Sequence, residues 1–173
     1  GYAGGAGSKL IVATPAVRRY LLENGYAWAA SSYDKNYYDV RSGIEETNKL
    51  ALNFKNIAAQ NGRTLAAPAK IYITGTSMGG HVAAAAVDDE AYEYANNKVR
   101  YNGAVPMCGA VGDEELFNYM GAAQLTAQKL SGYEATEFPV PVATMAAISA
   151  NMKAALFTTF PSVPTAAGAK WKG

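Results

Sequence analysis

The five residues from Gly75 to Gly79, Gly-Thr-Ser-Met-Gly, have the clearest capacity for chemistry. They match the pattern G-x-S-x-G, in which a serine lies on a sharp turn from a β-strand into an α-helix. Such a turn needs small residues two positions before and two positions after the serine. It also places Ser77 at a helix N-terminus, where the dipole and free N–H groups favour an oxyanion. The pattern predicts that Ser77 is a nucleophile; the alternative is a glycine-rich turn with an incidental serine.

A serine nucleophile needs a general base within about 2.6–3.2 Å of its hydroxyl. His81 is the only histidine of the sequence, and it lies one turn further along the helix that Ser77 begins, whereas the hydroxyl of Ser77 points away from that helix. We therefore expect His81 on a helix face or an interface, and not as the base. Asp113 could supply an acid. It also opens an acidic stretch that is typical of a helix N-terminus, and we favour that capping role.

The elements that must hold the serine are short and follow one another closely. Residues 70–74, Lys-Ile-Tyr-Ile-Thr, predict a short strand. Residues 75–80 predict the sharp turn, and the alanine-rich stretch 81–98 predicts a helix. Gly80 would let this helix pack tightly on its strand. A second strand is predicted over residues 103–107. Strands that alternate with helices in this way favour right-handed βαβ crossovers and a parallel sheet.

The segments before the turn continue this alternation. Thr14-Pro15 predicts the start of a helix that ends at Asn24-Gly25. Residues 26–33 are aromatic and small, and they predict a buried strand. Ser42 and Glu45 fit a capping box for a helix that runs to Asn61-Gly62.

The alternation stops at Asp113. Residues 113–130 predict a helix, residues 143–156 predict a second helix, and the stretch to 173 predicts a loose, proline-containing tail. The fold class is therefore α/β in the first part of the chain, with a parallel sheet flanked by helices, and helical after it.

The order strand, Gly-Thr-Ser-Met-Gly-Gly, helix, preceded by a helix, the 26–33 segment and a glycine-rich loop, resembles the α/β-hydrolase superfamily. Within it, the sequence is similar to the secreted bacterial and fungal serine esterases of the polyester-depolymerase and feruloyl-esterase-like branches. The resemblance implies that residues 1–112 are a partial hydrolase core, because three predicted strands are fewer than such a core needs. Residues 113–173 would be the start of a cap or lid, or a connecting segment.

The resemblance also assigns roles to residues around the serine. The backbone N–H groups of Met78 and Tyr2 would form the oxyanion hole, and Gly75, Gly79 and Gly80 would shape the turn. The superfamily's catalytic serine is followed by an acid and then a histidine, so we expect the histidine, and the acid unless Asp113 serves, to come from outside residues 1–173. A longer chain, a nicked precursor with a companion polypeptide, or a second chain would each supply them.

The function implied is the hydrolysis of a carboxylic ester, in a small molecule or a polymer, through an acyl-enzyme on Ser77. A serine peptidase or amidase on the same fold shares this constellation, since the turn does not separate esters from amides. A binding protein that keeps the fold and lacks the catalytic histidine is the alternative from another class.

Composition excludes several other classes of function. The 15 basic and 14 acidic residues give a net charge of +1, which argues against a nucleic-acid-binding face. No apolar run reaches the roughly 18 residues of a membrane span. Neither a metal-ligand spacing nor a phosphate-binding loop occurs, so we expect no cofactor. Low charge with abundant tyrosine, alanine, asparagine and serine favours a secreted or periplasmic protein, and a cytoplasmic one remains the alternative.

Two further expectations concern single side chains. Cys108, the only cysteine, follows an apolar strand and is expected to be a buried thiol. Tyr33, Tyr37 and Tyr38 follow the predicted 26–33 strand at the sheet edge where ligands of α/β proteins bind. They could line a pocket, although we favour ordinary surface positions for them.

Overall fold

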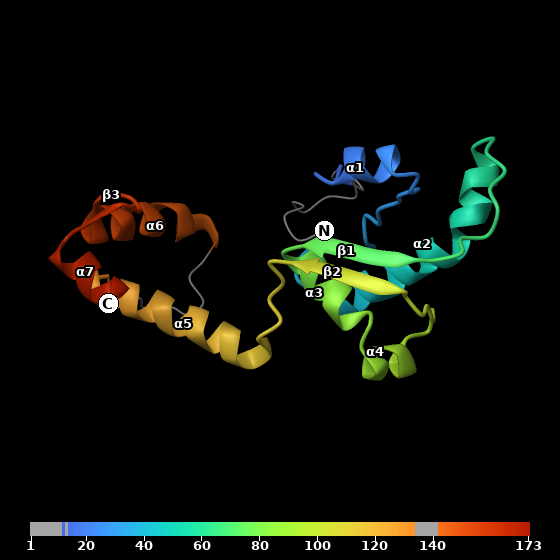
Figure 1. Ribbon diagram of the computed structural model, residues 1–173. Helices are drawn as coiled ribbons and strands as arrows, with labels where there is room; N and C mark the ends of the chain where they lie inside the picture. Colours follow the sequence, from blue (N-terminus) through green and yellow to red (C-terminus); the bar gives the residue numbers. More distant parts are fainter. Residues whose placement is uncertain (1–11, 13, 134–141) are drawn as a thin grey trace. The chain divides into compact units, whose positions relative to one another are not determined.

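The computed structural model describes residues 12, 14–133 and 142–173. The chain divides into two compact units, residues 1–111 and residues 112–173 (Figure 1). The division expected from the sequence lies between residues 112 and 113. Each unit is described by itself.

The first unit is a mixed α/β structure built on a two-stranded parallel sheet. Its elements along the chain are α1 (Arg18–Glu23), α2 (Val40–Gln60), β1 (Tyr72–Thr76), α3 (Met78–Ala85), α4 (Asp89–Tyr94) and β2 (Gly103–Met107). The pairing begins with Tyr72 beside Gly103 and ends with Thr76 beside Met107. Helices α3 and α4 form the crossover, and both strands therefore end at the same edge of the sheet.

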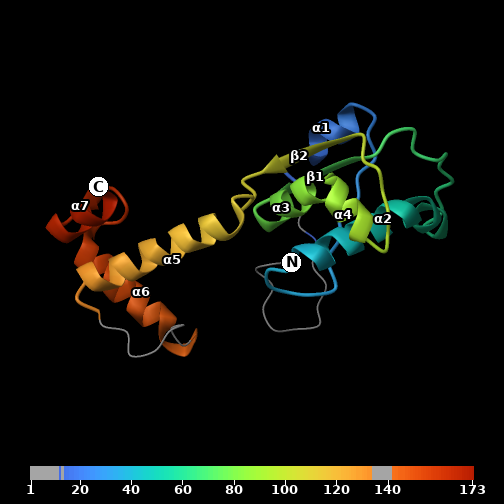
Figure 2. The ribbon, with the colours of Figure 1, turned by 90° about the horizontal axis from the view of Figure 1, so that it is seen from below.

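Helix α3 packs on both strands, and α2 packs on α3 (Figure 2). The buried side chains between them form one apolar core, which consists of Ile44, Ile73, Val82, Ala83 and Ala86. The alanine-rich sequence of α3 explains this layering, because short side chains let a helix lie close to the sheet. On the other face of the sheet, the part of the chain that the structure describes leaves side chains exposed: Val105 is 59% exposed, and Tyr72 is 49% exposed although the ring of Tyr26 contacts it at a centroid distance of 6.4 Å.

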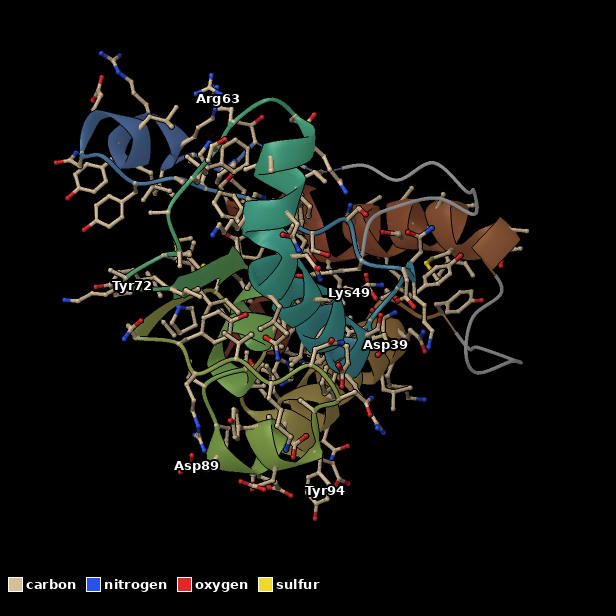
Figure 3. All side chains as sticks on the ribbon, turned by 90° about the vertical axis from the view of Figure 1, so that its right-hand side faces the viewer. Asp39, Lys49, Arg63, Tyr72, Asp89 and Tyr94 are labelled. Carbon is tan, nitrogen blue, oxygen red and sulfur yellow. The ribbon has the colours of Figure 1, made fainter. Side chains whose placement is uncertain are left out.

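Helix α2 does not begin with the predicted capping box. Its N-cap is Asp39, labelled in Figure 3, whose carboxylate accepts a hydrogen bond of 2.9 Å from the backbone N–H of Ser42. Glu45 points elsewhere: its two carboxylate oxygens accept hydrogen bonds from the backbone and side-chain N–H groups of both Asn96 and Asn97. The capping-box prediction is wrong because a loop distant in sequence supplies better donors to Glu45.

Two other elements of this unit differ from the predictions. Residues 26–33 form no strand, since no described strand lies beside them to accept and donate hydrogen bonds. The segment ends at Tyr33, whose φ of +57° turns the chain out of the extended conformation. The predicted 81–98 helix is two helices, because Asp88 caps the second of them through a 2.9 Å bond from the N–H of Glu90.

The second unit is mainly helical. It contains α5 (Asp113–Leu130), α6 (Val142–Leu156), β3 (Phe157–Thr159), β4 (Val163–Pro164) and α7 (Ala166–Lys172). The two long helices lie where the sequence places them, but the predicted loose tail is wrong: it is a short antiparallel hairpin followed by α7. Thr165 caps α7 through a bond from Gly168 N–H, and Trp171 Nε1 donates to the carbonyl of Ala123 on α5 at 2.9 Å. In the part of the chain that the structure describes, no helix combines the length and apolarity that a membrane crossing requires.

Glu45 gives the first unit a pH-dependent contact. Partial burial alone would raise the pKa of its carboxyl, but the four hydrogen bonds from Asn96 and Asn97 outweigh burial and lower the pKa below its ordinary value of 4.5. A carboxyl whose pKa falls on folding stabilises the folded state above the unfolded pKa, and this contribution disappears as the pH falls through the folded pKa.

We expect Glu45→Gln to reduce the free energy of unfolding at pH 7 by about 1 kcal/mol, because charge-assisted hydrogen bonds are lost. The difference from the wild type should shrink as the pH falls below about 4.5. Urea unfolding followed by circular dichroism between pH 7 and 3 measures both. Glu46→Gln is the matched control on the same helix: Glu46 pairs with Lys49 at 3.5 Å, and the hydrogen bonds from Asn96 and Asn97 go to Glu45. A pH-independent difference at Glu45 would contradict this account.

Candidate active site

Ser77 joins β1 to α3 in a strained backbone conformation. As the N-cap of α3 it has φ +57° and ψ −123°, a combination that only glycine adopts readily. Its side chain is exposed. The backbone N–H of Ser77 donates to the carbonyl of Met107 at the end of β2, at 2.9 Å, so the strand pairing continues into the turn and holds the serine at the sheet edge.

Gly75 is required by the sharpness of this turn. A Cβ at Gly75 would overlap the backbone carbonyl group of Gly79. Gly79 itself is not required to be glycine: the nearest described atom to a Cβ there is the hydroxyl of Tyr33, at 3.8 Å. The turn therefore demands a glycine two residues before Ser77 and accepts any small residue two residues after it.

A second close approach joins α3 to the chain that leaves β2. A Cβ on Gly80 would overlap the carbonyl oxygen of Met107, and a Cβ on Gly109 would lie 2.7 Å from the backbone nitrogen of His81. The two glycines let backbone pack on backbone at the N-terminal end of α3. Sequence reasoning found Gly80 and missed Gly109, whose only signal was its place two residues beyond a predicted strand.

The described part of the expected oxyanion hole consists of Met78. Its N–H belongs to the first residue of α3 and has no carbonyl one turn earlier in the helix to accept it. The side chain of Met78 is buried at 4% exposure and anchors the helix start. Tyr2, the other expected donor, lies outside the described residues.

His81 is engaged by a tyrosine. Its Nδ1 lies 2.8 Å from the hydroxyl of Tyr38, and the two ring centroids are 5.8 Å apart. Its backbone N–H donates to the carbonyl of Ser77 at 3.1 Å, as helix geometry requires. Among the described residues, no hydrogen bond links the imidazole to the Ser77 hydroxyl.

The three tyrosines after the 26–33 segment take different positions. Tyr33 is half-buried in the core beside α3, and burial raises the pKa of its hydroxyl. Tyr38 contacts His81, whereas Tyr37 is 64% exposed. Two of the three therefore contact the core or the helix that begins at Ser77, and one lies on the surface.

Asp113 and Cys108 also differ from the expectations. Asp113 is the first residue of α5 in the second unit; the N-cap is Gly112, and no side chain caps this end. The acidic first turn is present, but Asp113 is not its cap. Cys108 is exposed rather than buried. Its φ of +50° turns the chain immediately after β2 and brings Gly109 against α3, which leaves the thiol on the outside.

Searches among family models, curated proteins and solved structures yield no significant match to this chain. Within residues 12, 14–133 and 142–173, no group of three or more His, Cys, Asp or Glu side chains could hold a metal ion.

The strain at Ser77 predicts a stability difference between two small substitutions. Ser77→Gly should unfold with a free energy about 1 kcal/mol higher than Ser77→Ala, because glycine adopts this φ and ψ without strain while alanine retains the strain. Urea unfolding of the two variants measures the difference. Equal stability, or a more stable alanine variant, would show that the backbone of Ser77 is unstrained.

The packing at Gly80 predicts a large effect of a single methyl group. Gly80→Ala should lower the free energy of unfolding by about 1–3 kcal/mol, since the Cβ displaces the carbonyl of Met107. Gly79→Ala is the matched control in the same turn of α3; it should be neutral or stabilise by up to about 1 kcal/mol through helix propensity. Thermal unfolding of both variants measures the two changes in stability. Similar changes for Gly80→Ala and Gly79→Ala would argue against the close approach of Gly80 to the carbonyl of Met107.

Proposed function

We propose that this chain carries the nucleophile of a serine hydrolase that acts on carboxylic esters. The single observation that carries the proposal is the conformation of Ser77: an exposed hydroxyl on a strained strand-to-helix turn. Backbone strain of this kind persists only where the surroundings enforce it, and it concentrates at functional sites. Gly75, Gly80 and Gly109 provide that enforcement by letting the backbones approach.

In the proposed reaction, the Ser77 hydroxyl loses its proton to a histidine and its oxygen attacks the ester carbonyl. The negative charge that forms on the carbonyl oxygen accepts a hydrogen bond from Met78 N–H and, by the resemblance, from Tyr2 N–H. The alcohol leaves with the proton from the histidine. Water then attacks the acyl-enzyme, with the histidine again taking a proton, and releases the acid and the free serine.

The histidine of this scheme is supplied from outside residues 1–173. Tyr38 already occupies Nδ1 of His81, and His81 lies one turn along the helix from Ser77. The same proposal makes the first unit an incomplete α/β-hydrolase core and the second unit its cap, in a secreted or periplasmic enzyme. The exposure of Tyr72 and Val105 among the described residues supports an incomplete core, because parallel sheets are normally covered on both faces.

The proposal predicts covalent labelling of one serine. A fluorophosphonate reacts with activated serines, so it should modify Ser77 in the native preparation. That preparation must retain any companion polypeptide. Intact-mass spectrometry before and after treatment, followed by peptide mapping, measures the modification. Ser77→Ala should abolish it, and Thr76→Ala, which removes the neighbouring hydroxyl, should leave it unchanged.

The other outcomes separate the alternatives. If the native protein, as isolated from its source, contains no polypeptide beyond the 18.2 kDa chain and Ser77 stays unlabelled, no histidine is supplied from elsewhere. That result would overturn the catalytic proposal and favour a hydrolase-like binding protein. If Ser77 reacts, matched p-nitrophenyl ester and p-nitroanilide substrates distinguish an esterase from a peptidase or amidase. An esterase should turn over only the p-nitrophenyl ester, or turn it over far faster than the p-nitroanilide.

A further inference from the structure

The second unit contains a cavity that the proposed hydrolase reaction does not use. It has a volume of about 470 Å³ and lies among α5, α6, α7 and the start of β3. Its wall is mostly apolar, formed by side chains such as Met152, Leu156, Phe157 and Trp171. This size and lining are typical of sites for small molecules, in which a few polar groups set the orientation of the ligand.

One of the polar groups on the wall is buried without a partner. Gln128 on α5 is 4% exposed, and its amide nitrogen Nε2 has no hydrogen-bond partner among the described residues. A buried amide without a partner opposes folding. Rotation about its terminal torsion is broad and roughly two-fold, so Gln128 can turn its amide toward an acceptor that enters the cavity.

A positive charge stands on the exposed part of the same wall. Lys153 on α6 lines the cavity, and its Nζ lies 5.2 Å from the ring centroid of Phe160, which is itself 55% exposed. In the part of the chain that the structure describes, Lys153 forms no ion pair with a carboxylate. The wall thus combines an apolar interior, an amide that lacks an acceptor and a cation that lacks an anion.

We propose that this cavity binds a medium-chain monocarboxylic acid. The hydrocarbon chain occupies the apolar interior beside Met152 and Trp171, the carboxylate pairs with Lys153, and an oxygen acceptor satisfies Gln128. The occupant is a free carboxylate because Lys153 and Gln128 both donate, and the apolar wall offers no further charge. This inference does not rest on the proposed hydrolase, and its test does not require Ser77 to react.

The test uses Trp171 as the reporter in the full 173-residue chain. Trp28→Phe removes the only other tryptophan, and Ser77→Ala in the same background removes any reaction. Titration with sodium decanoate should change the emission of Trp171 saturably, and decanol should bind about tenfold more weakly because it lacks the charge. No saturable change with decanoate would overturn the proposal.

Three variants distinguish a ligand site from a structural gap. Lys153→Gln should weaken decanoate about tenfold and leave decanol unchanged, whereas Lys170→Gln, an exposed lysine of α7 outside the cavity wall, should change neither. Gln128→Met should raise the melting temperature, since the buried unpartnered amide is removed, and yet weaken decanoate. A rise in melting temperature with unchanged binding would show that Gln128 plays no part in the site.

The last experiment fills the cavity with a larger side chain. Ser149→Phe places a ring in the cavity from α6, and it should abolish the decanoate response while the circular dichroism spectrum stays native. Should this variant unfold, the smaller Ser149→Leu replaces it and should weaken binding instead. Unimpaired decanoate binding by a folded Ser149→Phe variant would overturn the proposal. So would equal affinities for decanoate and decanol, if Lys153→Gln leaves both affinities unchanged.

Discussion

The close approach of two backbones at Gly80 and Gly109 is the constraint on which the first unit depends. Because neither residue carries a Cβ, the start of α3 lies against the chain that leaves β2. That contact allows the N–H of Ser77 to reach the carbonyl of Met107. The hydrogen bond then holds the serine in a conformation that its own side chain disfavours. The core behind it joins Ile44 of α2 and Ile73 of β1 to Val82 and Ala83 of α3 and to Ala86, which ends that helix.

The two units treat their buried polar groups differently. In the first, Asn48 is 3% exposed, yet its amide donates to the carbonyl of Asn97 at 2.6 Å and accepts from the hydroxyl of Tyr101 at 2.7 Å. Burial in this network raises the pKa of Tyr101 to about 12. A satisfied network of this kind fixes one arrangement of α2 and the loop before β2. In the second unit, Gln128 has no comparable partner in the described chain, so its helices enclose a polar group that the fold itself does not satisfy.

Sequence patterns predicted the elements whose signals are local. Neighbouring residues in the sequence marked the end of the strand at Met107 and the start of the helix at Asp113. The glycines around Ser77 likewise indicated a sharp turn. Two of the failures arise from contacts between distant residues. Glu45 satisfied a local capping rule but binds a loop some fifty positions away, and the tail became a helix partly because Trp171 reaches α5. A local pattern does not encode a partner that lies far away in the sequence, as it does for Glu45 and Trp171.

The hydrogen bonds between β1 and β2 also set an order of events for the newly made chain. Thr74 and Val105 are register partners across the sheet and lie 31 positions apart in the chain, and the hydroxyl of Thr74 donates to the carbonyl of Val105. The strained backbone of Ser77 is held only after this loop has closed, and parallel pairing of that kind is among the slower steps of folding. A nascent or unfolded chain therefore carries an ordinary, relaxed serine. The special geometry at this position is a late property of the molecule, and it comes into existence together with the sheet.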